Sequence, residues 1–413
     1  MIVDSYLPTN QGRGRLARRF DEAGYGCVRV QSSPEVPILF RSSLSLDGYA
    51  ANIVHDGDLD ETIRAVAAHE PVAVVAGSEV GVEFADTLSE ALGLPTNGTA
   101  LSSARRDKFR MIETIKAAGV HGADQLLVES EDQLAAWHAD RGGRVVVKPI
   151  RGGGGDGVFF CDSPEESVRA YRALINRGNV YTSTNEAVVA QEYHFGAEYM
   201  LNTVSRDGHH HVCDIWKTSR ISANGVLDLC DAVYLMKREG EVQQQLADYA
   251  YEVLDALGIR HGPAHIEIKM TPKGPCLVEV GARIAGGDLS HYAFLGVGES
   301  QVEWTVDAYV DPDRFMARYA EDYRLQAHFA SVAMVSPVEG TLAGYPHLDE
   351  LKSLESLLEV RTLVQPGERI SRTVDDLTYP VIVNLRHDVE EVVLRDSGTV
   401  RYLDGTAFYR TAG

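Results

Sequence analysis

The sequence predicts a mixed fold, part α/β and part α+β, that begins with a Rossmann-like domain. Two observations carry this prediction. Apolar strands alternate with amphipathic helices over the first quarter of the chain, which is the order expected of a parallel sheet. Later strands follow one another through short turns, and an α+β region ends the chain. The 413 residues allow two to four domains of ~150 residues each.

The first quarter of the chain consists of short strands and helices with recognisable ends. A helix over residues 82–92 is stopped by Gly93 and Pro95. The strand before it leads into Gly77-Ser78-Glu79. The expected strands are residues 1–6, 27–30 and 72–76, and a further helix covers residues 59–67.

A glycine-rich turn after the first strand resembles a dinucleotide-binding fingerprint. It contains Gly12-x-Gly14-x-x-Ala17. That fingerprint also needs an acid at the end of the second strand, to bind a ribose. Here Val30 is followed by glutamine and two serines, so we favour a tight strand-to-helix turn.

The middle of the chain combines helices with a series of strands. A helix is expected over residues 105–119, with Ser102 or Ser103 as its cap. Another begins at the capping box Ser163-Pro-Glu-Glu166. The remaining expected elements are strands at residues 145–149, 158–161, 187–191, 199–206 and 209–218 and a helix at residues 242–257.

The segment from Lys148 to Gly157 is rich in glycine. The glycines are Gly152, Gly153, Gly154, Gly155 and Gly157. Their backbone N–H groups can approach phosphate oxygens closely, and Lys148 adds a positive charge. The Walker A spacing is absent, because no Gly-Lys-Ser/Thr follows. Since the loop joins two strands, we expect a flap over a triphosphate rather than a merely mobile surface loop.

Two carboxylates face each other in a predicted hairpin. Its strands flank the turn 271–274, so Glu267 and Glu279 lie in cross-strand register. Side chains alternate along a strand, which gives the hairpin a polar face and a core face. The polar face is expected to hold His265, Glu267, Lys269, Glu279 and Gly281, with Leu277 as its one apolar member. The core face is expected to hold Ile266, Ile268, Met270, Cys276, Val278 and Val280.

This pair of acids predicts a metal site. Directly opposed carboxylates have Cβ atoms ~5 Å apart and repel each other. A divalent cation with oxygen ligands removes that cost, and beside a triphosphate Mg²⁺ is the natural choice. The alternative is a solvated acidic pair with Lys269 as its partner. Arg283 continues the same alternation and would point into the site, the alternative being a surface arginine.

Three further segments carry weaker signals. Residues 191–198 begin with an amide and an acid, which can bond an adenine amino group, and end in a second acid, which can bind ribose hydroxyls. Residues 209–211 are three histidines that would alternate between faces, so a solvated hairpin edge is preferred to a metal site. Trp216 stays open between the core and a substrate contact.

Composition excludes several classes of partner. The chain has 39 Lys and Arg against 60 Asp and Glu, a net charge of −21, which repels nucleic acid and anionic lipid. It has no run of ~18 apolar residues that could span a membrane, and no signal-peptide pattern at its start. The five cysteines form no CxxC pair and suggest reduced thiols in a cytoplasmic protein.

Together these motifs resemble the ATP-grasp superfamily and, within it, the carboxylate–amine ligases that join amino acids. Their order is the family's: a segment at residues 102–119 that carries Lys108, a lysine with a glycine loop, an adenine linker, a metal-acid hairpin and an arginine. The strand end at Glu79 and the run from Glu279 to Gly286 are similar to the L-amino-acid ligases. One departure is Gly281, which stands where many ATP-grasp enzymes have an asparagine.

The resemblance implies an ATP-grasp fold in four parts. Residues 1–104 would be a Rossmann-like pre-grasp domain and residues 105–187 a small lobe with the flap. Residues 188–310 would be a large lobe with the metal site, which residues 311–413 complete.

The resemblance also implies a role for each motif residue. Arg283 would be the catalytic residue that steadies the reacting carboxylate and its acyl phosphate. Glu267 and Glu279 would hold Mg²⁺, with Mn²⁺ as a substitute. The implied ATP ligands are Lys108, Lys148, Gly153, Gly154 and Gly155 at the phosphates, Gln191, Glu192 and His194 at the adenine, and Glu198 at the ribose. The implied substrate-side residues are Glu79, Trp216, His265, Gly286 and Gly287.

The expected reaction joins the carboxylate of one amino acid to the amine of another and releases ADP and phosphate. Small-molecule amino acids are the expected partners, and a homodimer is the expected assembly. One alternative is an ATP-grasp ligase of another substrate class, of the purine-pathway or carboxylase type. Phosphorylated substrates would need an arginine-rich pocket, whereas Arg283 is nearly alone in its segment. A non-enzymatic nucleotide sensor fits poorly, because sensing needs neither opposed metal acids nor a catalytic arginine.

Overall fold

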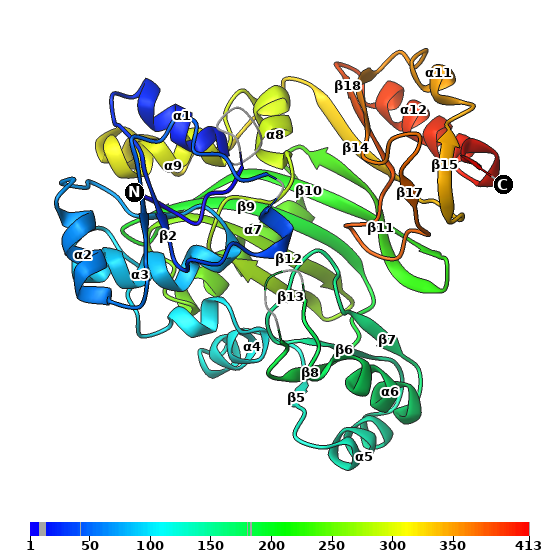
Figure 1. Cartoon of the computed structure of the whole chain (residues 1–413), viewed down its shortest axis with the longest axis horizontal. Helices are drawn as coiled ribbons and strands as arrows, with labels where there is room; N and C mark the ends of the chain where they lie inside the picture. The colour runs from blue at the N-terminus through cyan, green and yellow to red at the C-terminus, as the bar shows by residue number, and fades with distance from the viewer. Residues whose placement is uncertain (8–13, 42, 180, 182–183, 413) are drawn as a thin grey trace.

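The computed structural model describes residues 1–7, 14–41, 43–179, 181 and 184–412. Its N-terminal sheet is parallel, as predicted, with the strand order β3-β2-β1-β4. The strands are β1 (Ile2–Val3), β2 (Val28–Gln31), β3 (Ala51–Val54) and β4 (Val75–Ala76), with helices α1 (Arg15–Glu22), α2 (Leu59–Ala67) and α3 (Val82–Ala91). This blue part lies at one side of the molecule (Figure 1). Gly12 of the predicted turn lies outside the described residues.

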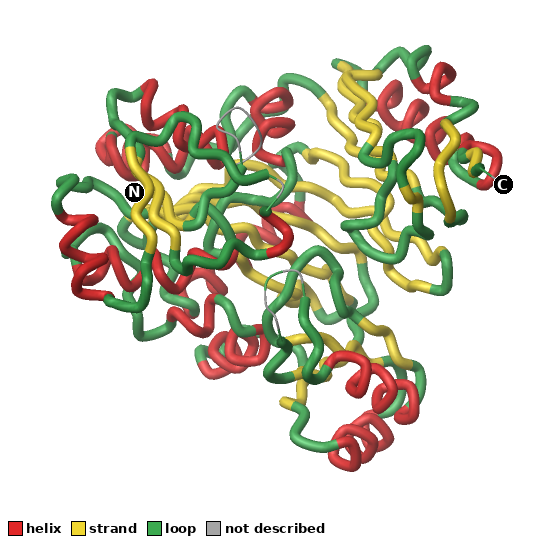
Figure 2. The backbone as a smooth tube through the Cα atoms, in the orientation of Figure 1, coloured by secondary structure: helices red, strands yellow, loops and turns green. Residues whose placement is uncertain are grey.

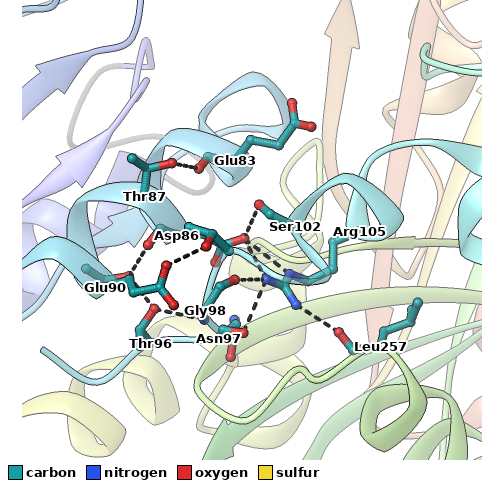
Figure 3. Close-up of polar contacts among 12 residues, drawn as sticks. Glu83, Asp86, Thr87, Glu90, Thr96, Asn97, Gly98, Ser102, Arg105 and Leu257 are labelled. Atoms are coloured by element: carbon teal, nitrogen blue, oxygen red, sulfur yellow. Dashed lines mark hydrogen bonds and ion pairs between the residues drawn. The ribbon is translucent and has the colours of Figure 1, made fainter. Parts of the chain in front are cut away.

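A buried arginine connects the N-terminal domain to the rest of the chain (Figure 3). The guanidinium of Arg105 is fully buried and pairs with Asp86 of α3 at 2.9 Å. It also donates to the carbonyl oxygen of Leu257 at 2.9 Å, just after α7 (Glu241–Ala256). Ser102 adds a hydrogen bond to Asp86 at 2.6 Å. The segment that precedes Lys108 is therefore tied to both sides of the molecule.

The helix expected from residue 105 begins later than predicted. Residues Ser102–Arg105 form a 3-10 helix, and α4 (Lys108–Ala117) follows it. Asp107, rather than Ser102 or Ser103, caps α4, since its carboxylate accepts from the N–H groups of Phe109 and Arg110 at 2.9 and 3.0 Å. Lys108 consequently occupies the first position of the helix.

The second sheet is antiparallel, in the order β5-β8-β6-β7. Ser163 caps α6 as predicted, because its hydroxyl accepts from the N–H of Glu166. β8 pairs with β5 and β6, so this strand belongs to the small sheet, although the expected boundary placed residues from 188 onward in the large lobe. The elements are β5 (Gln125–Leu127), α5 (Glu131–Arg141), β6 (Val145–Pro149), β7 (Phe159–Cys161), α6 (Pro164–Leu174) and β8 (Val188–Glu192).

The largest sheet in the described part of the chain has eight strands, and these strands run across the middle of the molecule (Figure 2). Their order is β13-β12-β9-β10-β11-β14-β18-β16. Buried side chains of α7 share one apolar core with β9, β10 and β12. The strands are β9 (Ala197–Arg206), β10 (His209–Ala223), β11 (Val226–Met236), β12 (Gly262–Thr271), β13 (Gly274–Gly281), β14 (His328–Met334), β16 (Leu357–Thr362) and β18 (Val381–His387).

The C-terminal region adds strands to this large sheet and also forms a small sheet of its own. β14, β18 and β16 extend the large sheet, and a smaller sheet in the order β17-β15-β19 lies beside them. Leu16 of α1 packs in one core with Val302 and Val306 of α9, which joins the N-terminal domain to the large lobe. The remaining elements are α8 (Leu289–Val297), α9 (Gln301–Val310), α10 (Pro312–Arg318), β15 (Gly340–Gly344), α11 (Leu348–Leu351), β17 (Arg369–Ile370), α12 (Glu390–Leu403) and β19 (Arg410–Thr411).

The histidine run on β10 differs from the prediction of a solvated edge. Only His209 is exposed, whereas His210 and His211 retain 9% and 2% of their exposure. The ring of His211 stacks on Trp304 at 3.5 Å between centroids, and its Nδ1 lies 2.9 Å from the carbonyl oxygen of Tyr319. The prediction is wrong because side chains on and after the neighbouring helices cover this strand.

Two expectations from composition can be compared with the fold. In the described part of the chain, every helix is too short or too polar to cross a membrane. The five cysteines carry free thiols, and four of them are buried.

Candidate active site

One cavity of about 580 Å³ draws its walls from every part of the chain. It is bounded by the N-terminal domain, the small sheet, the large sheet and the C-terminal region. Every predicted site residue except Trp216 lines it: Glu79, Lys108, Lys148, Gly153, Gly154, Gly155, Gln191, Glu192, His194, Glu198, His265, Glu267, Glu279, Arg283, Gly286 and Gly287.

Trp216 lies elsewhere. Its side chain is fully buried and packs in an apolar cluster with Tyr292 and Phe329. The indole N–H donates to Asp214 at 2.6 Å. Of the two roles left open by the sequence, the structure therefore favours the core over a substrate contact.

The hairpin of β12 and β13 presents its two acids to the cavity. Glu267 and Glu279 are direct cross-strand partners, as the spacing predicts. A bulge follows Glu267, so that Ile268 pairs with Leu277. Leu277 therefore packs in the core and only borders the cavity, which differs from its expected place on the polar face because the alternation of side chains breaks at a bulge.

Positive groups surround the two acids. The ammonium of Lys108 donates to Glu279 at 2.9 Å and to the carbonyl oxygen of Gly152 at 3.1 Å. Nε2 of His265 lies 3.4 Å from Glu267. Burial would raise the pKa of Glu267, but its hydrogen bond to His265 and the nearby positive charges lower that pKa to about 2. Glu267 thus keeps its charge at neutral pH.

The donor set fits a magnesium ion that also binds phosphate. Within the described ranges, no three His, Cys, Asp or Glu side chains gather around one point. Two opposed carboxylates remain, and Mg²⁺ is commonly held by one or two carboxylates plus substrate phosphates. Lys269 is not their partner, since it pairs with Asp228 at 2.8 Å. A purely solvated acidic pair neutralised by Lys269 is therefore not what the fold provides.

The glycine loop is a hairpin connection over the cavity. β6 and β7 pair antiparallel on either side of it. Gly154 and Gly155 have φ angles of 65° and 73°, a region that L side chains rarely adopt. The carbonyl oxygen of Gly154 accepts from the N–H of Asp376 at 3.3 Å. The loop is therefore docked on a C-terminal segment.

Lys148 stands at the end of β6 beneath this loop. Burial, reinforced by the charge of Lys108, lowers the pKa of Lys148 to about 8. An ammonium that is already stripped of water gains more from a phosphate oxygen than an exposed one does. The lysine is thus placed and tuned to bind an anion.

The residues predicted at the adenine are held by other groups of the cavity wall and its surroundings. The amide of Gln191 donates to Gln125 at 2.8 Å, and the carboxylate of Glu192 accepts from the N–H of Asp124 at 3.0 Å and pairs with Arg141. Nε2 of His194 lies 3.1 Å from the sulfur of Cys276, and burial lowers the pKa of His194 to about 4. His194 is therefore a neutral ring in the cavity wall.

Glu198 is held by a cation that the sequence did not reveal. Its carboxylate pairs with Arg220 of β10. Burial raises the pKa of Glu198, and the charge of Arg220 opposes that rise. Arg220 could not be found from spacing, because it reaches Glu198 through strand pairing.

Arg283 is buried at the cavity wall and pairs with Glu79 of the N-terminal domain. Its Nε donates to Glu79 at 2.9 Å, and its side chain is only 14% exposed. This excludes a surface arginine. The other carboxylate oxygen of Glu79 accepts from Arg106 at 2.7 Å. Burial would raise the pKa of Glu79, but the charges of Arg283 and Arg106 outweigh it and lower the pKa to about 2.

Several lining residues escaped sequence analysis. They come from strands and connecting segments that carry no assigned motif, and only the tertiary fold brings them to the cavity. Among them, only Asp375 and Asp376 have a sequence signal, which is the polar run before β18. They include Leu39, Tyr181, Arg220, Asp228, Asp375, Asp376 and Leu377.

A relative of nearly equal length decides the family. Over 393 residues the chain is 31% identical to dapdiamide A synthase of Enterobacter agglomerans, an alignment that covers 94% of this chain and 91% of that protein. The chain belongs to the ATP-grasp ligases. The family model described as ATP-grasp domain matches residues 143–291, which include the flap, both opposed acids and Arg283.

Other ATP-grasp ligases share parts of the sequence or the fold. An L-arginine-specific L-amino acid ligase of Bacillus subtilis is 22% identical to this chain. The alignment covers 71% of this chain and 70% of that ligase. The L-amino acid ligase from Bacillus licheniformis superposes with a TM-score of 0.74 at 19% identity, covering 100% of this chain and 98% of that one. A carboxyaminoimidazole ribonucleotide synthase complexed with ATP has a TM-score of 0.69 at 15% identity and covers 97% of both chains. These two structural likenesses show the fold alone.

Proposed function

We propose that this ATP-grasp ligase joins the carboxylate of one amino acid to the amine of a second through an acyl phosphate, releasing ADP and phosphate. The observation that carries the proposal is the single cavity in which two lysines, the glycine loop, the opposed acids and Arg283 meet. The naming of dapdiamide A synthase and of two L-amino acid ligases among the similar proteins supports amino acids as the substrates.

The nucleotide would lie between the small and the large sheet. Lys108, Lys148 and the N–H groups of residues 153–155 would bind its phosphates, since both lysines line the cavity beside this loop. Lys108 would then exchange Glu279 for a phosphate oxygen. At the other end, Gln191, Glu192 and His194 would contact the adenine and Glu198 the ribose.

Glu267 and Glu279 would hold Mg²⁺. When bound, the ion supplies charge neutralisation for the phosphoryl group that is transferred. The proposal requires both carboxylates to stay ionised, and the lowered pKa of Glu267 supports this. Replacement by Mn²⁺ stays a prediction, which a metal-substitution assay would test.

Arg283 would bind the reacting carboxylate and its acyl phosphate. A planar guanidinium suits two oxygens at once, and it gains strength as negative charge develops on them. Its anchor on Glu79 leaves it directed along one wall of the cavity. His265, Gly286 and Gly287 line the same region and would contact the amino-acid substrates.

Hydroxylamine in place of the second amino acid tests the mechanism. An acyl phosphate would be trapped as a hydroxamate, with ADP formed in equal amount. Phosphate release across pairs of amino acids, with mass detection of the product, would identify the substrates. Stoichiometric formation of AMP would contradict the proposal and indicate an adenylating enzyme.

The remaining expectations concern the setting of the enzyme. Free and mostly buried thiols support a cytoplasmic location, in which thiols stay reduced. A homodimer stays a prediction, and light scattering would test it.

A further inference from the structure

The carboxylate of Glu79 lies between two guanidinium groups. One oxygen accepts from Arg106 and the other from Arg283. Only 4% of the Glu79 side chain and 5% of the Arg106 side chain are exposed. The chain of charges therefore runs from the segment before α4, through the N-terminal domain, to the arginine beside the metal acids.

The backbone that carries Glu79 is fixed by two close approaches. A Cβ atom on Gly77 would lie 2.7 Å from the Cβ of Ser5, and one on Gly81 would lie 2.6 Å from the carbonyl oxygen of Val3. Both contacts are possible only for glycine. The loop after β4 is thus pressed against the end of β1, at the carboxyl edge of the parallel sheet, where α/β folds commonly place functional groups.

Gly281 leaves room for the pair of Glu79 and Arg283. A Cβ at this position would lie 2.8 Å from Oε2 of Glu79 and 3.1 Å from Cζ of Arg283. The φ angle of Gly281 is not in the left-handed region, so its backbone conformation does not require glycine. The space it leaves is filled by the ion pair.

We infer that Arg106 and Glu79 are positioning residues that hold the guanidinium of Arg283 in place for the reaction, in space that Gly281 leaves open. The inference rests on the proposed function of Arg283. Glu79 then acts through Arg283 instead of contacting the substrate. The Rossmann-like domain contributes an anchor to catalysis.

The geometry shows what this anchor achieves. Nε of Arg283 is used on Glu79, and Nη1 donates to the carbonyl oxygen of Ile284 at 3.1 Å. Among the described contacts, Nη2 has no protein partner, while Arg283 lines the cavity. Nε and Nη1 are thus held by the protein, and the N–H groups of Nη2 are left for a ligand. Because the donors are fixed before substrate binds, little reorganisation is needed when charge develops.

The test compares variants of Arg106 in two backgrounds. Arg106→Gln should lower kcat about 10- to 100-fold, the loss typical of a residue that orients a functional group, and change the KM for ATP less than 3-fold. Arg106→Lys keeps the charge and should restore part of kcat. In an Arg283→Lys enzyme, Arg106→Gln should add almost nothing. Arg110→Gln is the matched control, since the Arg110 side chain is 65% exposed on the same segment.

A second variant, at Gly281, tests the contact between Glu79 and Arg283 by filling the space beside it. Gly281→Ala should displace Glu79 and lower kcat about as much as Glu79→Gln does, and the two changes together should be no worse than either. Equal losses from Arg106→Gln in both Arg283 backgrounds would overturn the inference, as would unchanged kcat in Arg106→Gln. A purely structural role would instead lower Tm and leave kcat per folded enzyme unchanged.

The outcome separates this inference from the proposed function. Phosphate release by the wild-type enzyme with amino acids is measured first, and its absence would count against the proposed function. In that case thermal unfolding still tests the ion-pair chain. A Tm shift for Glu79→Gln with Arg106→Gln that equals the sum of the single shifts would overturn the inference, because coupled partners do not add.

Discussion

Truncation of Asp86 should destabilise the protein strongly. Its carboxylate accepts from Nε and Nη2 of Arg105 at 3.2 and 2.9 Å and from Ser102 at 2.6 Å. Asp86→Ala would leave the fully buried guanidinium of Arg105 with carbonyl partners only, including Gly98 and Leu257. Burial raises the pKa of Asp86 against the effect of Arg105, which indicates that desolvation of this pair is costly.

The size of the loss follows from that burial. Removal of one partner from a buried pair costs about 3–5 kcal/mol, whereas replacement of both by apolar groups is often neutral. Unfolding entropy is about 2.1 cal/mol/K per residue, so the Tm should fall by about 3–6 °C if the whole chain unfolds as one unit. If residues 1–104 unfold alone, the fall should be about 14–23 °C. The Tm shift therefore also reports whether the two sides of the ion pair unfold together.

Differential scanning calorimetry of three variants would test this reasoning. Asp86→Ala should show the loss, and Asp86→Leu with Arg105→Met should recover at least half of it. Glu22→Gln is the control, because Glu22 pairs with Arg18 on the surface, where solvent screens ion pairs and they add little to stability. A Tm shift for Asp86→Ala no larger than that of Glu22→Gln would refute the argument.

Three further predictions concern the cavity. Glu279→Gln should lower turnover about 100-fold or more at saturating Mg²⁺ and leave the fold intact; a near wild-type rate would exclude Glu279 as a metal ligand. Gly154→Val places a β-branched residue at a φ of 65°, which costs about 1–2 kcal/mol and should raise the KM for ATP about 10-fold. Gly142→Val, at a φ of 67° outside the cavity, should leave that KM unchanged. Because the pKa of Lys148 is about 8, the lysine is charged below that pH, and the KM for ATP should rise above pH 8 in the wild type but not in Lys148→Arg.

Short-range patterns predicted the most informative part of the site. The turn at residues 271–274 was enough to place Glu267 opposite Glu279, and the two-residue alternation of side chains put both on one face. The alternation failed one residue further on, where the bulge moves Leu277 to the core. A bulge depends on how two paired strands twist in the folded sheet, and no residue near this one predicts it.

Helix starts and burial were predicted less well. Ser102 and Ser103 are good capping residues, yet Arg105 is drawn into a buried pair with Asp86, and the helix starts only after Asp107. The pattern of the strand predicts that His211 is exposed to solvent, whereas in the structure the ring of Trp304 stacks on it. In both cases a partner distant in the sequence decides the outcome.

For the same reason, the partners of the site residues could not be predicted from the sequence. Arg106 and Arg220 bind Glu79 and Glu198 across large sequence separations. Arg106 lies in the segment that carries Lys108, but the sequence assigned no role to either arginine. Sequence analysis thus found the groups with characteristic spacing and missed the groups that orient them.

The contact between the glycine loop and the C-terminal segment bears on how the enzyme is made. Asp376, whose N–H donates to Gly154, leaves the ribosome long after the loop on which it docks. A nascent chain can therefore complete its lysines and both carboxylates while the triphosphate site still lacks one of its walls. Of the described residues that line the cavity, residues 375–377 are the last to be synthesised, so the cavity is complete only once this segment has folded onto the glycine loop.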